Sequence, residues 1–400
     1  MRIAFVLPGK LPVPAVRGGA IESLLNNLLD ENEKASSFDA IIFSEYDIEA
    51  EKASRKYSSS RFFYIKRGRT YNVLNFLFRI GRKINPPKAT FLDINYIVRT
   101  LRRLNPDKII VEGSFLKLIE LKKFFPRDKL VFRLHADLIV QVTNETLQVL
   151  KSASLFIVAS DFLRRRIEQT SGDKTPAVRI LRNGIRSEFF SRVTDEKKAN
   201  LLNRYGISGS EPIIMYVGRI IKSKGIMQLI EALIKAREKA AFHFVLVGSF
   251  GSGFGFGDEE NDFTSNLRRI VMDNKSWITV TGFVSNSDLP AFYQIATIVV
   301  VPSICEDVSP LVVNEAMASG TPLIVTDAGG IQEYITNQCA IVVKRDEQIV
   351  ENICDSICGL LEEPQRLKAM GSAALINSLD YTSARFYNSF CTILENSVAK

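Results

Sequence analysis

The sequence predicts an α/β protein of two domains, each built on a doubly wound parallel sheet with helices on both faces. Its 400 residues exceed one ordinary domain, since about 150 residues per domain is usual. Short, nearly continuous apolar runs alternate with longer segments of helical periodicity, which is typical of strands covered on both faces. These runs form two series, separated by a polar stretch at about residues 183–211.

Each series predicts its own sheet. The first comprises strands IAFVL (3–7), AIIFS (40–44), KIIV (108–111), LVFRL (130–134) and SLFIVA (154–159). The second comprises PIIMYV (212–217), FHFVLV (242–247), WITVT (277–281), TIVVV (297–301), PLIV (322–325) and CAIVV (339–343). We therefore expect domains at 1–190 and 191–380, with a last helix at 381–400 that crosses back to the first domain.

Composition excludes several classes of protein. Hydrophobic residues make up 46% and charged residues 24%, which rules out general disorder. No apolar run reaches the roughly 18–20 residues of a membrane span, and MRIAFVLPGK does not resemble a signal peptide, so we expect a cytoplasmic protein. Five cysteines without a pairing pattern and only two histidines argue against a disulfide framework and a metal centre.

Charge is unevenly distributed. Residues 1–190 hold 33 Lys and Arg against 20 Asp and Glu, whereas the remainder holds 19 against 24. A basic first half can attract nucleic acid, anionic lipid or a phosphorylated substrate, or can simply be a solvated surface.

Candidate site residues follow the predicted strands, because ligands of open parallel sheets bind beyond the carboxyl ends of the strands. Gly18 and Gly19 precede a helix that should start near Ala20, where free amides attract anions; a simple tight turn is the alternative. After Gly218, Arg219 and Lys224 can converge on a diphosphate, unless both are merely solvated.

Two further junctions carry polar candidates. Asp307 should lie in a loop and Glu315 in the next helix, where carboxylates can accept sugar or ribose hydroxyls; helix capping and a surface glutamate are the alternatives. His135 ends a strand of the first domain, and a structural role is its alternative. Phe283 and Val284 follow a strand, where they can abut a flat base.

The order and spacing of these segments resemble the large nucleotide-sugar-dependent glycosyltransferase family 4. The resemblance rests on RGGAIE (17–22), RLHAD (133–137), RNGI (182–185), GRIIKSKG (218–225), TGFV (281–284) and DVSPLVVNEAMASGTPLIVTDAGGIQE (307–333). The opening segment is similar to enzymes of bacterial surface-polysaccharide and spore-coat pathways.

The resemblance implies a GT-B fold, with two Rossmann-like domains facing across a cleft. The first would hold a carbohydrate or lipid-linked acceptor, and the second a UDP-, GDP- or dTDP-linked sugar. The family generally retains anomeric configuration and needs no metal or other cofactor. The implied catalytic residues are His135, Arg219, Lys224, Asp307 and Glu315. The implied donor-binding residues are Gly18, Gly19, Gly218, Arg219, Lys224, Phe283, Val284, Glu306, Asp307, Val308, Ser309, Pro310, Leu311, Val312 and Glu315.

One position departs from the family pattern. Asp307 stands where the family usually has Glu, and the adjacent Glu306 is a candidate substitute. This departure leaves open a catalytically inactive GT-B partner or structural subunit.

The basic first half then has a candidate partner, the anionic inner face of the membrane, where family acceptors are often lipid-linked. No nucleic-acid-binding motif is present, so we expect no nucleic-acid partner. The basic and apolar residues expected to dock there are Lys66, Arg67, Arg69, Phe76, Leu77, Phe78, Arg79, Arg82 and Lys83.

Overall fold

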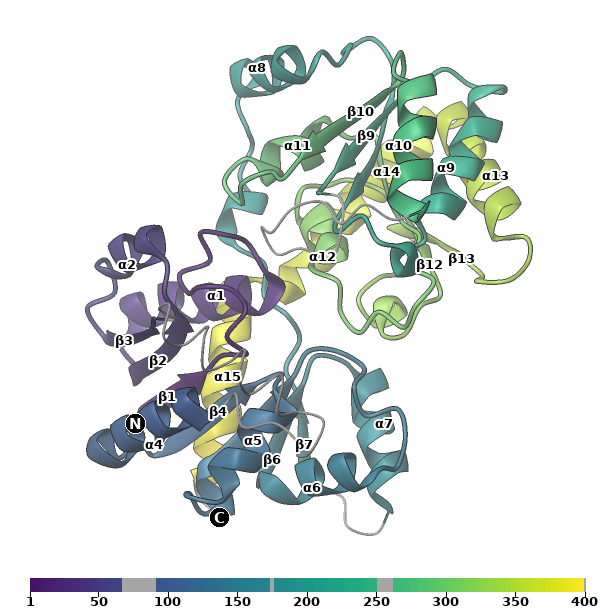
Figure 1. The fold of residues 1–400 in the computed structure, drawn as a ribbon. Coiled ribbons are helices and arrows are strands. Elements are labelled where there is room, and N and C mark those ends of the chain that lie inside the picture. Colours follow the sequence, from purple (N-terminus) through teal and green to yellow (C-terminus); the bar gives the residue numbers. More distant parts are fainter. Residues whose placement is uncertain (67–90, 173–175, 250–261, 399–400) are drawn as a thin grey trace. The chain divides into compact units, whose positions relative to one another are not determined.

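The computed structural model describes residues 1–66, 91–172, 176–249 and 262–398. The chain divides into two compact units, unit 1 (Met1–Arg182 and Phe386–Lys400) and unit 2 (Asn183–Arg385) (Figure 1). Within the described ranges, no helix combines the length and apolar character needed to cross a bilayer.

Unit 1 contains a seven-stranded parallel sheet in the order β3-β2-β1-β4-β5-β6-β7. Its strands are β1 (Arg2–Val6), β2 (Asp39–Glu45), β3 (Ser60–Ile65), β4 (Lys108–Glu112), β5 (Leu130–Leu134), β6 (Leu155–Val158) and β7 (Ala177–Ile180). Its helices are α1 (Ala20–Ala35), α2 (Ile48–Ser54), α4 (Phe91–Leu104), α5 (Phe115–Lys122), α6 (Asn144–Ser152) and α7 (Asp161–Ser171). Strands β4, β5 and β6 are buried along their whole length, as expected for a sheet covered on both faces.

The last helix, α15 (Ser383–Val398), belongs mostly to unit 1. The ring of Phe390 stacks on Phe5 of β1 with centroids 6.0 Å apart. Tyr387 donates a buried hydrogen bond of 2.8 Å to Asn32 of α1. These contacts attach the end of the chain to its beginning.

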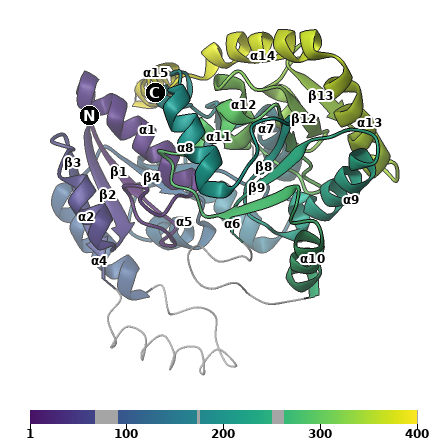
Figure 2. The same ribbon diagram turned by 90° about the horizontal axis from the view of Figure 1, so that it is seen from above.

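Unit 2 contains a six-stranded parallel sheet in the order β10-β9-β8-β11-β12-β13. The strands are β8 (Ile213–Val217), β9 (His243–Val247), β10 (Ile278–Gly282), β11 (Ile298–Val301), β12 (Leu323–Thr326) and β13 (Ala340–Val343). The helices are α8 (Asp195–Tyr205), α9 (Ile226–Arg237), α10 (Asp262–Asp273), α11 (Leu289–Ile295), α12 (Leu311–Ala318), α13 (Ile349–Glu362) and α14 (Pro364–Ser378). Figure 2 views the same ribbon from above.

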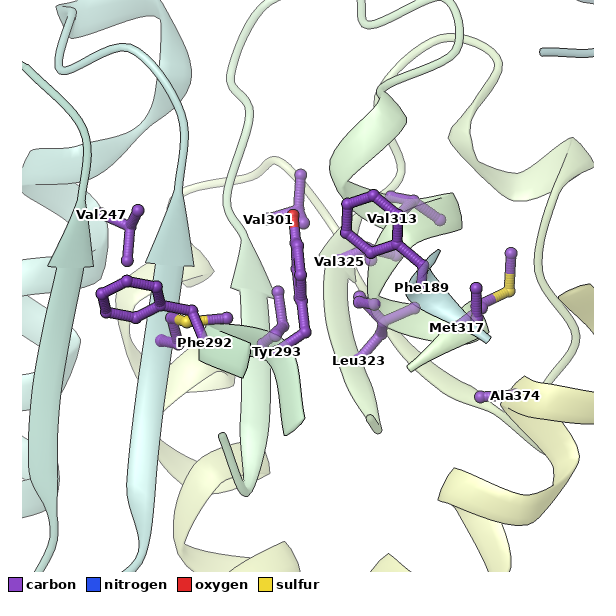
Figure 3. Close-up of a cluster of buried hydrophobic side chains, with 14 of the residues drawn as sticks. Phe189, Val247, Phe292, Tyr293, Val301, Val313, Met317, Leu323, Val325 and Ala374 are labelled. Atoms are coloured by element: carbon purple, nitrogen blue, oxygen red, sulfur yellow. The ribbon is translucent and has the colours of Figure 1, made fainter. Parts of the chain in front are cut away.

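Apolar cores cover both faces of the unit 2 sheet, because successive strand residues point to opposite faces. One core packs α11 and α12 against the strands, and Figure 3 shows Phe292, Tyr293 and Phe189 gathered there. The other core packs α9 and α13, including Ile226 and Ile353.

The predicted fold class is confirmed, and all eleven predicted strands are present. Strands β3 and β7 were missed by the sequence prediction. Both are edge strands, so their side chains are only partly buried and their sequences, SRFFYI and AVRI, are not continuously apolar. If the strands of each unit are numbered along the chain, their order across the sheet is 3-2-1-4-5-6, with a seventh strand added at the end in unit 1. This is the order of Rossmann-like sheets, in which ligands bind at the point where the order reverses.

Candidate functional site

The candidate residues collect at the reversal point of each sheet. In unit 2 this point lies between β8 and β11, and Lys224 and Asp307 occupy the two loops that follow these strands. In unit 1 it lies between β1 and β4. Gly19 lies in the loop after β1, Glu112 is the last residue of β4, and His135 directly follows β5. Each unit therefore carries its own cluster of candidate residues.

The loop after β8 presents two cations. Gly225 immediately precedes α9 and has a positive φ of 71. A Cβ atom at Gly225 would lie 1.8 Å from the carbonyl oxygen of Pro302, so this close approach to the loop after β11 requires glycine. Arg219 is exposed, and Lys224 leaves 24% of its side chain exposed. Both side chains are therefore accessible to an anionic ligand.

The loop after β11 is hydrogen-bonded to the Lys224 loop. The backbone N–H of Ile304 donates to the carbonyl oxygen of Ser223 at 3.2 Å. Lys224 Nζ lies 2.5 Å from Asp307 Oδ2, and Ser303 Oγ donates to the same oxygen at 3.0 Å. A lysine and a carboxylate thus share one small polar cluster beyond the carboxyl ends of β8 and β11.

Glu306, the candidate substitute for Asp307, has a different partner. Its carboxylate accepts hydrogen bonds of 3.2 and 3.3 Å from Arg345, which follows β13. Arg345 also donates to Asp327 at 3.0 Å. The carboxylate beside Lys224 is therefore that of Asp307, whereas Glu306 anchors the loop to its neighbour.

Glu315 lies half-buried in α12. Its Oε2 accepts a 2.8 Å hydrogen bond from the hydroxyl of Tyr293 in α11. Burial raises the pKa of Glu315, while the Tyr293 hydrogen bond and the charge of Arg186 oppose that shift. The helix begins after Pro310 without a side-chain cap, so Asp307 does not cap it.

The remaining donor candidates of unit 2 differ in exposure. Phe283 leaves 60% of its surface exposed, whereas Val284 is buried in the core of unit 2, so only Phe283 offers its side chain to a flat base. Val308 is also buried. The half-buried residues around the start of α12 are Ser309, Pro310, Leu311 and Val312. The segment DAGGIQEYI forms a single 3₁₀ turn at Ile331–Glu333.

In unit 1, Gly18 and Gly19 immediately precede α1, which starts at Ala20 as predicted. Both have positive φ, 75 and 98. Glu22 in the first turn of α1 folds back towards Gly19, where an added Cβ would lie 2.2 Å from Glu22 Oε2. Burial raises the pKa of Glu22 to about 7, and the charge of Glu112 adds to this, opposed by a backbone hydrogen bond and Lys10.

This buried carboxyl predicts a pH-dependent stability. Its folded-state pKa lies above the unfolded value near 4.5, so the folded protein binds the extra proton and the free energy of unfolding falls as pH rises from about 4.5 to 7. We expect Glu22→Gln to remove this fall in the free energy of unfolding, which amounts to up to roughly 3 kcal/mol in the wild type. Urea unfolding of wild type and variant at pH 4.5 and 8 measures this.

Glu33→Gln is the matched control, because its effect has the opposite sign. Hydrogen bonds from Ser58 and Ser59 lower the pKa of Glu33 against the opposing effect of burial. The stability that Glu33 contributes is therefore present above its unfolded pKa and lost as pH falls. If the free energies of unfolding of wild type and Glu22→Gln differed by the same amount at both pH values, the raised pKa of Glu22 would be contradicted.

His135 follows β5, as predicted, and is paired with a residue that sequence reasoning missed. His135 Nε2 lies 2.5 Å from Glu112 Oε2, and Arg133 Nη1 lies 3.5 Å from Glu112 Oε1. The other histidine, His243, lies in β9 and makes a 2.9 Å hydrogen bond to Thr279.

The structure also shows other contacts that local patterns did not indicate. Asn183 donates to the carbonyl and hydroxyl oxygens of Ser309, at 3.2 and 2.8 Å. Only the RNGI match gave a signal for Asn183. The motif matches also contain Glu22, Arg133 and Asp327, but no role was assigned to these residues or to Arg186. The site partners missed altogether are Glu112, Tyr293 and Arg345.

The proposed membrane-docking segment lies largely outside the described residues. Lys66 is exposed, with its ammonium 4.2 Å from the centre of the Tyr46 ring. The other residues of that segment lie outside the described residues. They are Arg67, Arg69, Phe76, Leu77, Phe78, Arg79, Arg82 and Lys83.

Comparison with known proteins finds glycosyltransferases among the relatives of this chain. Residues 197–375, which make up most of unit 2, match the family described as "Glycosyl transferases group 1". Over these residues the chain is similar to the group 1 glycosyltransferases. It is 26% identical over 345 residues to YtcC of Bacillus subtilis (strain 168), covering 84% of this chain and 78% of YtcC. It is also 24% identical to spore coat protein SA of the same organism, covering 93% of both chains.

A solved structure agrees on the fold. The Anabaena protein Alr3699/HepE, solved in complex with UDP, matches with a TM-score of 0.74 at 18% identity, over 99% of this chain and 100% of that chain. At this identity the likeness shows the fold, and the expected GT-B architecture of two Rossmann-like domains is confirmed.

Proposed function

We propose that this chain transfers a sugar from a nucleoside diphosphate sugar to a hydroxyl of a carbohydrate or lipid-linked acceptor, with retention of anomeric configuration and without a metal. The carrying observation is the Lys224–Asp307 cluster, with Arg219 in the same loop as Lys224, at the reversal point of the sheet in the unit that matches the family. The UDP complex of Alr3699/HepE supports a nucleotide-linked donor. The similarity to spore coat protein SA supports a role in the assembly of a bacterial surface layer, which we propose to be polysaccharide.

The reaction places its charge where this cluster lies. The bond between sugar C1 and the phosphate oxygen breaks, and its electron pair leaves with the diphosphate. The acceptor hydroxyl oxygen bonds to C1, and its proton passes to the diphosphate or to solvent. Arg219 and Lys224 would stabilise the departing charge, since preorganised cations act most strongly where charge develops.

The other residues of unit 2 would hold the rest of the donor. Glu315 would accept hydrogen bonds from the ribose, and the loop from Asp307 to Leu311 would hold the sugar and distal phosphate. Phe283 would stack on the base. Gly18 and Gly19 of unit 1 would close over the donor, and His135 would contact its sugar. A lipid-linked acceptor would bring the protein to the inner face of the membrane.

A screen of UDP-, GDP- and dTDP-sugars tests the proposal, with released nucleotide as the readout. We expect one nucleotide class to be hydrolysed slowly by the chain alone, and faster when a sugar acceptor is supplied. Calorimetric titration with the same compounds is run in parallel. Tight binding without any release would instead favour the inactive partner, and no binding at all would refute both readings.

A further inference from the structure

A buried trio of charged and polar side chains lies at the carboxyl ends of two central strands of the unit 1 sheet, β4 and β5. Glu112 ends β4, and Arg133 is its register partner on β5, two residues before His135. The side chains of Glu112 and Arg133 are 0% and 3% exposed, and that of His135 is 11% exposed. One carboxylate oxygen faces the guanidinium and the other faces the imidazole, so Glu112 bridges the two.

The surroundings set the charge of each group. Burial opposes ionisation of Glu112, but Arg133 and the hydrogen bond from His135 outweigh it and lower the pKa of Glu112. Burial, with Arg133, lowers the pKa of His135 despite the opposing effect of Glu112. At neutral pH the pair is therefore a carboxylate and a neutral imidazole. Glu22 of α1 adds a second carboxyl close to Glu112, and Lys10 lies near Glu22.

Geometry then decides which imidazole nitrogen carries the proton. An ionised carboxylate can only accept hydrogen bonds, so Nε2 must donate to Glu112 Oε2 across the 2.5 Å separation. A neutral imidazole has one N–H, so Nδ1 keeps its lone pair. Such a nitrogen accepts a hydrogen bond and is complementary to a hydroxyl group.

We propose that Glu112 is a positioning residue that holds His135 as the neutral tautomer protonated on Nε2, so that Nδ1 accepts a hydrogen bond from a hydroxyl of the substrate sugar. The proposal rests on the proposed function, which brings a sugar to His135. It adds Glu112 as the residue that orients His135, the tautomer of His135, and the direction of the hydrogen bond to the sugar. Arg133, whose guanidinium also lies 5.2 Å from the Phe386 ring of α15, keeps the carboxylate ionised and in place.

Nitrogen-15 NMR of the wild-type protein tests the tautomer without any change to the site. The chain has only two histidines, so ¹⁵N-histidine labelling of tag-free protein gives two ring systems. The signals of His135 are those lost in His135→Gln. At pH 7.5 we expect a neutral ring with the proton on Nε2. A ring protonated on Nδ1, or an imidazolium, would overturn the proposal.

The variant Glu112→Gln tests the consequence for transfer. An amide can present either its oxygen or its NH₂ to the ring, so we expect a mixed tautomer signal. Loss of an orienting partner typically costs about 10–100-fold where such partners have been measured at metal sites. We expect a fall of that size in kcat, with the KM for the sugar nucleotide found in the donor screen changed less than threefold.

Two further variants guard against a loss of folding. Glu112→Asp keeps the charge opposite Arg133 but shortens the reach to His135, so we expect it to fold and still lose kcat. Glu33→Gln changes a hydrogen-bonded glutamate of α1 elsewhere in unit 1, and we expect wild-type kcat. Full kcat in folded Glu112→Gln would overturn the positioning role. Absence of transfer in the wild type, with the expected tautomer present, would refute the proposed function and leave the Glu112–His135 assignment supported.

Discussion

Replacing Lys224 with alanine is expected to lower the rate of glycosyl transfer by about 10²–10³-fold without unfolding unit 2. That is the usual cost of removing one preorganised group that stabilises developing negative charge. The side chain is partly exposed and reaches Asp307 from a short turn, so little packing is lost. Initial rates with the sugar nucleotide found in the donor screen, together with the circular dichroism spectrum, measure both parts of the expectation. Arg219→Ala should act similarly.

Lys222 provides the matched control, because it lies in the same 3₁₀ turn (Lys222–Lys224) and is exposed. Lys222→Ala removes the same charge two residues away, and we expect it to retain nearly full activity. The comparison separates a specific contact with the diphosphate from a general effect of positive charge. Near-normal turnover in both Arg219→Ala and Lys224→Ala would contradict the site assignment.

Replacing Gly225 with alanine is expected to cost at least about 2 kcal/mol of stability and to abolish donor binding. A non-glycine residue at φ 71 already pays about 1–2 kcal/mol. The added Cβ would also lie 1.8 Å from the Pro302 carbonyl oxygen, which no rotation can relieve because the obstacle is backbone. The loops that carry Lys224 and Asp307 must then separate. Urea unfolding and nucleotide titration measure the two effects.

Gly206→Ala isolates the contribution of backbone conformation alone. Gly206 ends α8 with φ 63, close to that of Gly225, and nothing lies within 4 Å of an added Cβ. We expect a loss of about 1–2 kcal/mol with donor binding intact. An equal loss in both variants would show that the approach of the two loops is not what requires glycine at 225.

The sequence indicated the strands and the site residues unequally well. Central strands such as β4 and β11 are buried on both faces, so their composition alone identifies them. Strands β3 and β7 pair with a neighbour on one side only, and their sequences lack the continuous apolar run by which the central strands were predicted. Among the site residues, those in glycine-containing loops after a strand, such as Lys224, were identifiable because the local pattern marks a ligand-binding turn.

Local composition thus accounts for the two Rossmann-like sheets and for Gly19, Lys224, Asp307 and His135 as candidate residues. It did not indicate the partners of these residues, because a polar side chain at a strand end looks the same whatever it faces. Glu112 and His135 are 23 residues apart, and Lys224 and Asp307 are 83 apart. Their contacts arise because parallel strands end at the same edge of a sheet, so strand order, and not sequence distance, determines which charges meet and which protonation states they adopt.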